Sequence, residues 1–541
     1  MKPSFAVNRR EFIAHSLALT GVALVFPSAD VVAAPARPLP AGDELAWASA
    51  SDLSRGMQRG ELRSVDIVQS CLARIDRLDR KGPMLGAMIE LNPDALAIAA
   101  ERDSERRAGR LRGPLHGIPV VVKDNVDTAD RLATSAGSTL LASSRAARDA
   151  FIIERLRAAG AVLLGKNNLS EWANFRSTRS SSGWSARGGL TRNPHVLDRS
   201  ASGSSSGTAC AVAAGYAPLG IGTETDGSII SPSSVCGIVG IKPTLGLWGR
   251  SGIIPIAHSQ DTPGPMARSV ADAALLLGPL TGVDPRDGAT QAGSGKSQRD
   301  YTSFLRRGAL AKARIGVPRN LAGFHPAVDR ALDAAVAALK SAGAVVLDDL
   351  KLPTAGQFDD AELEVLFYEF KTDLEAYLAT RGASVPVRTL ADIIEYNVRE
   401  RAKEMPWFEQ ELFERAQAKG SLADPAYRAA RELCVKLART EGLDPLLAQH
   451  RLDAIICPSN APAWLTDFMS GDHYIGGNTS FAAVAGYPSL TVPMGFIHSL
   501  PLGLSFIGRP WSEGRLIELG YSFEALTQAR RPPGFLPTLI A

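Results

Sequence analysis

Residues 117 to 125 read Gly-Ile-Pro-Val-Val-Val-Lys-Asp-Asn. The run Val120-Val121-Val122 follows Gly and Pro and ends in polar residues, which predicts a short buried strand that ends in Lys123. A lysine held in an apolar interior loses the solvation of its charged form, so its pKa falls and it can act as a base near neutral pH. This stretch therefore predicts a central strand and the first candidate catalytic residue.

Strand and helix patterns alternate on both sides of this stretch. Helical periodicity predicts a helix that begins at Ser64, with Ser64 as its cap, and another helix between Asn92 and Gly109. Further helices are expected at 151–159, 325–345 and through most of 360–440, and further strands at 161–166, 238–241, 344–347, 454–458 and 489–506. This alternation is typical of a single large α/β domain in which helices cover both faces of a mixed sheet.

The aromatic residues of the region 360–440 are expected to lie in the core. They are Phe367, Tyr368, Phe370, Trp407 and Phe408.

Composition excludes several functional classes. The 541 residues include 59 basic and 56 acidic ones with no basic block, so neither nucleic acid nor an anionic membrane is an expected partner. The five cysteines are widely spaced in apolar contexts, which indicates buried thiols and not a disulfide framework. Because neither a Cys-x-x-Cys motif nor a Cys/His cluster occurs, we expect no metal and no organic cofactor.

The first 36 residues have the pattern of an export signal. Arg9 and Arg10 precede an apolar stretch from Phe12 to Phe26, and Ala34 and Ala36 have the spacing of a cleavage site. The stretch is too short and weakly apolar to span a bilayer. We therefore expect twin-arginine export to the periplasm or beyond, no membrane insertion after signal removal, and a mature domain at 37–541.

Two loops rich in glycine and serine follow the first strand. They read Ser-Gly-Ser-Ser-Ser-Gly at 202–207 and Gly-Thr-Glu-Thr-Asp-Gly-Ser-Ile at 222–229. A serine hydroxyl beside clustered backbone N–H groups, with a neutral lysine near it, supplies the parts of an acyl-transfer site.

Other interpretations of these loops are weaker. The string Gly203 to Gly207 matches the Gly-x-Ser-x-Gly elbow of α/β-hydrolases, but residues 198–201 before it lack a strand pattern. A Ser-x-x-Lys site is excluded, since no lysine has a serine three residues before it. The string 292–297 resembles a phosphate-binding loop, but Thr290 occupies the position of its first glycine. A dispersed site of two serines and Lys123 remains.

Several motifs together resemble one enzyme family. They are Gly117-Ile118-Pro119, Lys123-Asp124-Asn125, Gly165-Lys166-Asn167, Thr-Arg-Asn-Pro at 191–194, the serine-rich loop, Cys-Gly-Ile-Val-Gly-Ile-Lys-Pro-Thr at 236–244, Gly-Pro-Met-Ala-Arg-Ser at 264–269, Ala-Gly-Tyr-Pro at 485–488 and Leu-Pro-Leu-Gly-Leu at 500–504. With this order and spacing, the chain resembles the amidase signature family, and within it most closely the bacterial peptide amidases. The signature core covers about 110–275.

The resemblance implies a role for each polar residue of the loops. Ser228 corresponds to the nucleophile, Ser204 to a bridging serine that follows a cis peptide bond, and Lys123 to the base. The separation of the two serines, 228 − 204 = 24, is that of the family and selects Ser204 over Ser202, Ser205 and Ser206. The backbone N–H groups expected to form an oxyanion hole belong to Thr225, Asp226, Gly227 and Ser228. Ser205 is expected to support Lys123 without touching the substrate.

Two departures from the broad family bear on the substrate. Many members have Gly-Gly-Ser at the nucleophile where this chain has Asp226-Gly227-Ser228, and many have arginine where it has Ile230. Without that cation a neutral amide is favoured over a carboxylate. The expected reaction is hydrolysis of a carboxamide, preferably the C-terminal amide of a peptide, to acid and ammonia through an acyl-serine.

Other functions stay open. The same chemistry could act on aryl or fatty amides or on small esters. An amidotransferase subunit that works on transfer RNA is disfavoured by the export pattern and by the lack of a basic face. A non-catalytic binding protein is disfavoured by the presence of Lys123, Ser204 and Ser228 together.

Overall fold

Strands from the whole length of the chain meet in one mixed sheet. The computed structural model describes residues 42–382 and 385–540. Within these ranges the main sheet has the strand order β1-β3-β2-β6-β8-β7-β12-β13-β11-β9-β10. Its strands are β1 (Met88–Leu91), β2 (Pro119–Lys123), β3 (Val162–Asn167), β6 (Leu219–Glu224), β7 (Val239–Lys242), β8 (Thr262–Ala267), β9 (Arg314–Pro318), β10 (Val345–Leu350), β11 (Ala454–Pro458), β12 (Ser489–Ile497) and β13 (Leu500–Ile507); β4 (Trp184–Ser185) and β5 (Gly189–Leu190) pair separately.

The strand that carries Lys123 lies between two parallel neighbours. β2 pairs in parallel with β3 and with β6, whereas β6 pairs antiparallel with β8. All residues of β2, β3 and β6 are buried, which explains why their sequences do not alternate between apolar and polar residues and become polar only at their ends. Because parallel neighbours end at the same edge of a sheet, the polar residues that end β2 and β6 lie close together.

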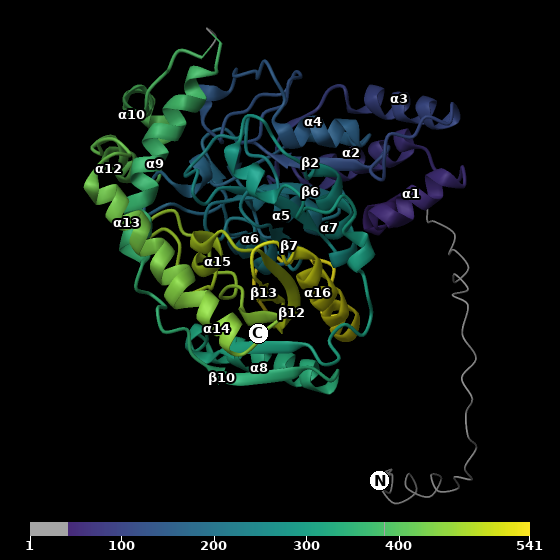
Figure 1. The fold of residues 1–541 in the computed structure, drawn as a ribbon. Helices are drawn as coiled ribbons and strands as arrows, with labels where there is room; N and C mark the ends of the chain where they lie inside the picture. Colours follow the sequence, from purple (N-terminus) through teal and green to yellow (C-terminus); the bar gives the residue numbers. More distant parts are fainter. Residues whose placement is uncertain (1–41, 383–384, 541) are drawn as a thin grey trace, which may run out of the picture. The chain divides into compact units, whose positions relative to one another are not determined.

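Helices flank this sheet (Figure 1). They are α1 (Ala50–Gln58), α2 (Ser64–Leu78), α3 (Ala95–Arg107), α4 (Phe151–Ala158), α5 (Ser206–Ala213), α6 (Ile230–Val235), α7 (Val270–Leu277), α8 (Pro326–Ser341), α9 (Asp359–Ala379), α10 (Leu390–Arg399), α11 (Arg401–Glu404), α12 (Glu411–Gln417), α13 (Pro425–Val435), α14 (Asp444–Gln449), α15 (Ser480–Ala485) and α16 (Glu513–Thr527). Short 3₁₀ turns and one π-helical segment, Lys436–Leu443, join them. α5 packs on β2 and β6, and α8 and α16 pack on β12.

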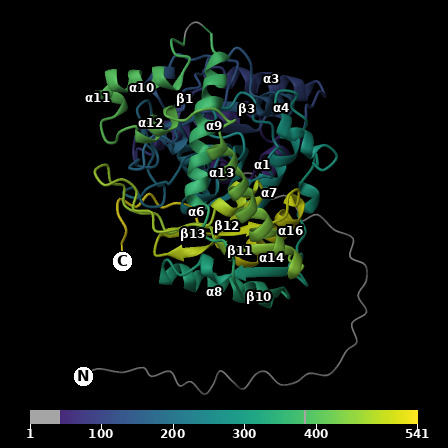
Figure 2. The same cartoon turned by 60° about the vertical axis from the view of Figure 1, so that its left-hand side comes forward.

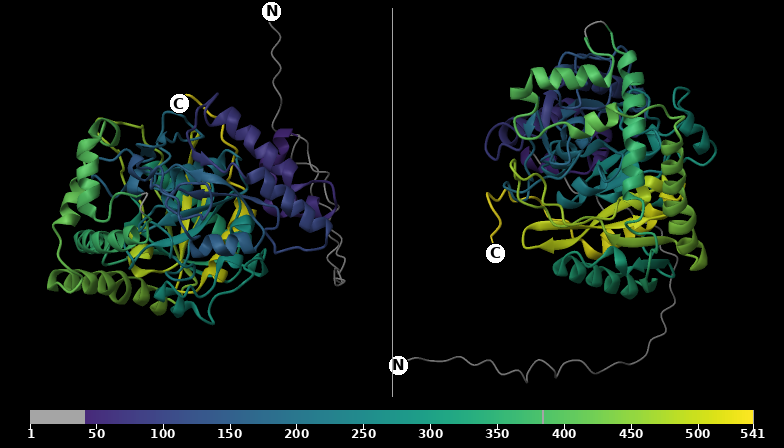
Figure 3. Two further views of the ribbon diagram at one scale, coloured as in Figure 1. Left: turned by 90° about the horizontal axis from the view of Figure 1, so that it is seen from above. Right: turned by 90° about the vertical axis from the view of Figure 1, so that its left-hand side faces the viewer.

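The helices α9 to α13 form a layer of their own at one side of the domain (Figures 2 and 3). α9 packs along α13 and α12. The inner side of this layer is apolar, with Phe367, Phe370 and Phe413 almost fully buried. Burial of such aromatic side chains is a large stabilising contribution, about 1.5–3 kcal/mol for each one. Glu362 of α9 connects this layer to the candidate active site through its contact with Gln260.

Most expectations about the fold are confirmed. The chain forms one large α/β domain with a mixed sheet, and the five cysteines are free and buried. Two details are wrong. Ser64 is the first residue of α2 and Arg63 is its N-cap; the Ser64 hydroxyl donates to the Gly117 carbonyl instead of capping the helix. Trp407 is 46% exposed and lies outside the core.

The predicted export signal lies outside the described residues and stays a prediction. Of the helices that the structure describes, none combines the length and the apolar character needed to cross a membrane.

Candidate active site

Lys123 ends β2 with its side chain fully buried. Its Nζ donates to Ser204 Oγ at 2.8 Å, to Thr223 Oγ1 at 2.9 Å and to the Thr223 carbonyl at 3.1 Å. Thr223 lies on β6, the parallel neighbour of β2, so the sheet itself brings these groups together. The amine therefore donates to a serine hydroxyl, and among the described residues no carboxylate bonds to it directly.

Burial lowers the pKa of Lys123 to about 7. Loss of hydration is the main cause, and the more distant charges of Asp261 and Glu224 oppose it. A lysine with this pKa is largely neutral at slightly alkaline pH and can then accept a proton from a hydroxyl.

Ser204 follows a cis peptide bond from Gly203 and is fully buried. The loop that carries it leads into α5, which begins at Ser206. The Ser205 N–H donates to the Ser228 carbonyl at 3.1 Å, and the hydroxyls of Ser202 and Ser231 lie 2.7 Å apart. The two serine-bearing loops are thus joined on both sides of Ser204, and the structure brings Lys123, Ser204 and Ser228 into one site.

Ser228 lies in the turn between β6 and α6 and is 7% exposed. Gly227 before it has a φ of 78°, and a Cβ there would come within 3.0 Å of Thr479 Oγ1, so glycine suits this position on both counts. The carboxylate of Glu224 accepts the N–H groups of Ile229 and Ile230 at 2.7 and 2.9 Å. These bonds fix the turn that follows Ser228.

Within the part of the chain that the structure describes, the backbone N–H groups of residues 225 to 228 donate to no other protein atom. Thr225, Gly227 and Ser228 are buried and Asp226 is partly exposed. Because backbone N–H groups without a protein partner are uncommon in folded proteins, these groups are available to bind an anion. They are the four groups that the sequence predicts as an oxyanion hole, and that role stays a prediction.

Side chains hold this segment in place from several directions. The Thr225 hydroxyl donates to Asp261 at 2.5 Å, and the Ser480 hydroxyl donates to Asp226 at 2.6 Å. Gln260 Nε2 donates both to the Thr225 carbonyl, at 3.3 Å, and to Glu362 of α9, at 2.7 Å. Burial raises the pKa of Glu362, and the nearby charge of Asp226 raises it further.

Ser205 does not contact Lys123 directly. Its Oγ donates to the Thr223 carbonyl at 3.1 Å and accepts the Thr223 N–H at 3.2 Å. Because the same carbonyl also accepts from Lys123, Ser205 supports the lysine through Thr223.

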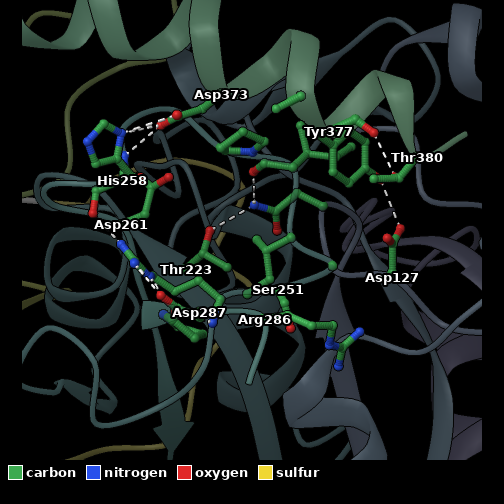
Figure 4. A pocket seen from close by; sticks show the side chains of 18 of the residues that line it. Asp127, Thr223, Ser251, His258, Asp261, Arg286, Asp287, Asp373, Tyr377 and Thr380 are labelled. Atoms are coloured by element: carbon green, nitrogen blue, oxygen red, sulfur yellow. Dashed lines mark hydrogen bonds and ion pairs between the residues drawn. The ribbon is translucent and has the colours of Figure 1, made fainter. Parts of the chain in front are cut away.

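A cavity of about 590 Å³ adjoins the site from the side of Thr223 (Figure 4). Thr223 and Asn125 line it, and Asn125 Nδ2 donates to Thr223 Oγ1 at 3.0 Å. The remaining wall is partly apolar, from Ile253 to Ile256.

His258, Glu369 and Asp373 lie close together beside this cavity. Their atoms are already engaged: the Asp373 carboxylate accepts from the N–H and Nδ1 of His258, and Glu369 accepts from the Ser259 N–H and the Tyr427 hydroxyl. This donor set matches a hydrogen-bonded ion pair better than a metal site.

The fold and the serine–lysine arrangement define an amide-hydrolysing enzyme of the amidase signature type. The family model described as Amidase matches residues 66–517, and the chain belongs to that family.

Solved and curated relatives agree with this assignment. The crystal structure of the native peptide amidase from Stenotrophomonas maltophilia is 52% identical, with a TM-score of 0.86 over 90% of this chain and 98% of that one. A probable amidase of Arabidopsis thaliana is 39% identical over 90% of this chain and 92% of its own length. A glutamyl-tRNA(Gln) amidotransferase subunit of Symbiobacterium thermophilum is 34% identical over 89% of this chain and 97% of its own length.

Sequence reasoning missed the residues that hold the site together. Thr223 and Glu224 are in the quoted string at 222–229, and their positions at the polar end of a buried strand were a usable signal. Gln260, Glu362 and Ser480 come from segments far away in the chain, and no local pattern indicates their contacts.

Proposed function

We propose that this protein hydrolyses the C-terminal carboxamide of peptides through an acyl-enzyme on Ser228, with Ser204 and Lys123 as proton carriers. The observation that carries the proposal is the contact of 2.8 Å between Lys123 Nζ and Ser204 Oγ, because it joins a buried amine with a pKa of about 7 to a serine hydroxyl. A hydroxyl can donate and accept at once, so Ser204 can relay a proton between Ser228 and the lysine.

The steps balance as follows. Ser228 Oγ attacks the carboxamide carbon while its proton passes to Ser204, whose own proton passes to Lys123. The carbonyl oxygen becomes negative beside the free N–H groups of residues 225 to 228. When the C–N bond breaks, the same relay returns the proton to the nitrogen, which leaves as ammonia. Water then attacks the ester by the same route, which releases the carboxylic acid and restores Ser228.

Three observations favour a peptide amide. The chain is 52% identical to a structure described as a peptide amidase. Ile230 is fully buried and supplies no cation close to the nucleophile, so a free carboxylate has no charged partner at this position. The carboxyl group of Asp226 also disfavours an anionic substrate in the loop that carries Ser228.

A panel of amidated peptides, free carboxamides, anilides and small esters tests the proposal through ammonia or amine release. We expect ammonia from amidated di- and tripeptides while their internal peptide bonds survive. The variant Ser228→Ala should form no acyl-enzyme detectable by mass spectrometry, whereas Ser505→Ala, at a buried serine of β13, should still form it. Cleavage of internal bonds, or preference for a fatty amide over every amidated peptide, would contradict the proposed substrate.

The similarity to amidotransferase subunits supports amide chemistry at the same site. A transferase function makes a separate prediction, namely that ammonia release requires partner subunits. Turnover of amidated peptides by the isolated chain would decide for the hydrolase.

A further inference from the structure

Several large apolar side chains are exposed on the loop between β11 and α15, together with Trp407, which stacks on Phe468 of that loop. The group, here called the apolar rim, consists of Trp407, Leu465, Met469, Tyr474 and Ile475, with exposures between 46% and 85%. Clustered exposed side chains of this size cost hydration free energy in a free domain and commonly mark a binding surface. Figure 2 shows the yellow-green loop after β11 on the same side of the domain as α11 and α12.

The loop that carries the rim is anchored to the segment of the proposed nucleophile. Residue 477 pairs with Asn460 just after β11, and the chain then reaches Thr479, which packs on Gly227, and Ser480, which donates to Asp226. The Tyr474 hydroxyl lies against Gly477. Tyr474 therefore belongs to the segment that continues to Thr479 and Ser480, which contact Gly227 and Asp226, the two residues before Ser228.

The other end of the rim rests on the loops that enclose the serine-rich segment. Phe468 stacks on Trp407 with ring centres 4.6 Å apart. The Ser181 hydroxyl donates to the Asp467 carbonyl, and Ser182 donates to the Asp472 carboxylate. Gly183, the next residue, donates its N–H to Ser170, near the hydroxyl of Ser206. The loop that carries the rim thus contacts residues 181 and 182, and through Gly183 and Ser170 it is linked to Ser206 at the end of the serine-rich segment.

Several polar side chains of this loop are engaged in hydrogen bonds or ion pairs. Asp467 pairs with His473, and Asp472 accepts from Trp464 Nε1 as well as from Ser182. The aromatic ring of Tyr474 makes an edge contact with Trp464, and the exposed residues Ser470 and His473 lie beside the apolar rim in the sequence. An occupant of this surface would gain burial of apolar area more than charge pairing.

We propose that the apolar rim binds aliphatic or aromatic side chains of the last two or three residues of the amidated peptide. This inference rests on the proposed function and adds a selectivity to it. The peptide backbone would extend from Ser228 past Asp226 towards Tyr474, and then along Ile475, Met469 and Trp407. The continuity of the rim with the loop of Ser228 favours the substrate over a separate protein partner as its occupant.

The first experiment compares acetylated tripeptide amides of equal length in which either of the last two residues is leucine, phenylalanine, glycine, aspartate or lysine. We expect kcat/KM to be roughly tenfold or more higher for leucine and phenylalanine than for glycine at one of these positions. Aspartate and lysine should be poorer than glycine, because the rim offers them no partner of opposite charge.

The second experiment uses Tyr474→Ser, Met469→Ser and Trp407→Ser in the full chain. We expect at least one of them to reduce the leucine-to-glycine ratio of kcat/KM several-fold, an effect that a general loss of folded enzyme would not produce because it lowers both values equally. Val345→Ser is the matched control, since Val345 is equally exposed at the edge strand β10 and should leave the ratio unchanged.

The outcomes distinguish a failure of the proposed side-chain selectivity from a failure of the proposed hydrolase function. Ammonia release from peptide amides without apolar preference, or with ratios unchanged in all three variants, overturns the inference and leaves the proposed function intact. The inference is also wrong if the variants lower only the hydrolysis of a long-chain alkyl carboxamide, or change only a self-association measured by size-exclusion chromatography. The occupant of the rim would then be an alkyl chain or a second copy of the protein. Hydrolysis of simple carboxamides alone, or no ammonia from any substrate, contradicts the proposed function itself and the inference with it.

Discussion

Two lysines on neighbouring strands, Lys123 of β2 and Lys166 of β3, are both fully buried but have different surroundings. They lie one register position apart, since Val122 pairs with Lys166. Lys166 Nζ donates to the carbonyls of Val126 and Ala133 and to the Thr134 hydroxyl, and several acidic groups, Asp124 first among them, oppose the burial that lowers its pKa. Lys123 Nζ instead meets the hydroxyl of Ser204.

The difference shows that burial alone does not make a lysine a catalytic base. Burial lowers the pKa of both amines. Only Lys123 has a hydroxyl partner that adjoins a second serine loop, so only its proton has a path to a nucleophile. Lys166 holds carbonyl groups of the segment 126–134 and has the contacts of a structural residue.

The largest effect is expected when each lysine is replaced by methionine. Lys123→Met should lower kcat/KM by at least about 10⁴-fold, as removal of a proton carrier from a catalytic triad does, while the protein stays folded. Lys166→Met removes the lysine donor from the Ala133 carbonyl, which costs about 1–3 kcal/mol for a group left unsatisfied, and weakens the bonding of the Val126 carbonyl and the Thr134 hydroxyl, which keep each other. Peptide-amide turnover and thermal unfolding of both variants measure the two effects.

The two variants should therefore differ in kind. Lys123→Met should lose turnover with the smaller change in the midpoint of unfolding, because the Thr223 carbonyl keeps the Ser205 hydroxyl as a donor and the Thr223 hydroxyl keeps Asn125 Nδ2. Lys166→Met should lose stability first. A folded, fully active Lys123→Met protein would refute the assignment of the base. A Lys166→Met protein that is as stable as the wild type but inactive would refute the distinction between the two lysines.

The pH dependence of activity and of stability gives a second test of the role of Lys123. Since burial lowers the pKa of Lys123 to about 7, kcat/KM should rise with pH through that value as the amine loses its proton. An unfolded lysine has a pKa of about 10.4, so between these two values the unfolded state binds a proton that the folded state does not. The free energy of unfolding should then rise with pH in this window.

The pH profile of kcat/KM of the wild type tests the expected rise in activity. Unfolding curves of the wild type and of Lys123→Met at several pH values test the expected rise in the free energy of unfolding. The stability gain between pH 7 and 10 should be smaller in Lys123→Met than in the wild type. An activity limb near pH 7 that instead disappears on replacement of His258, the half-exposed histidine beside the cavity, would assign the titration to another group.

The sequence predicts much of this arrangement. Buried runs such as Val120 to Val122 predict β2 because a strand covered on both faces is apolar along most of its length, and the resemblance to the amidase signature family, through its spacing of the two serines, implies which hydroxyl meets Lys123. The contact and the cis bond at Ser204 are present in the structure, while the chemical roles stay predictions. The support from Gln260, Glu362 and Ser480 depends on tertiary packing between distant segments, which no local periodicity reports. Trp407 shows the same limit, since helical context alone does not distinguish a core aromatic from an exposed one.

A smaller effect is expected at Glu362, which is remote from both lysines. It accepts from Gln260, which also donates to the Thr225 carbonyl, and the nearby charge of Asp226 adds to the burial that raises the pKa of Glu362. Glu362→Ala should loosen the N–H groups beside Ser228 and lower kcat about tenfold, less than the full loss of one oxyanion donor. Glu362→Gln keeps a neutral group of the same size and should restore most of the rate. Equal losses in both variants, or a change in KM alone, would contradict a positioning role.

The smallest effect is expected at Ser205, which touches Lys123 only through Thr223. Ser205→Ala removes the acceptor of the Thr223 N–H and one of the two donors to the Thr223 carbonyl, while both contacts of Lys123 to Thr223 can persist. Of these two lost hydrogen bonds, the one that leaves the buried Thr223 N–H without its acceptor costs about 1–3 kcal/mol of stability, and the lysine keeps Ser204 in reach. We therefore expect a lower unfolding midpoint, a decrease in kcat/KM of no more than about tenfold, and an activity limb that moves by a fraction of a pH unit.

The direction in which the activity limb moves is a separate test of Ser205. Because Lys123 then donates to a carbonyl that no longer accepts from Ser205, the charged form of the lysine is better stabilised and the limb should move to higher pH. If the activity limb moves to lower pH, or if kcat/KM falls as far as in Lys123→Met, Ser205 takes part in proton transfer. Lys123 would then differ from Lys166 by two serine hydroxyls that act in catalysis, Ser204 and Ser205.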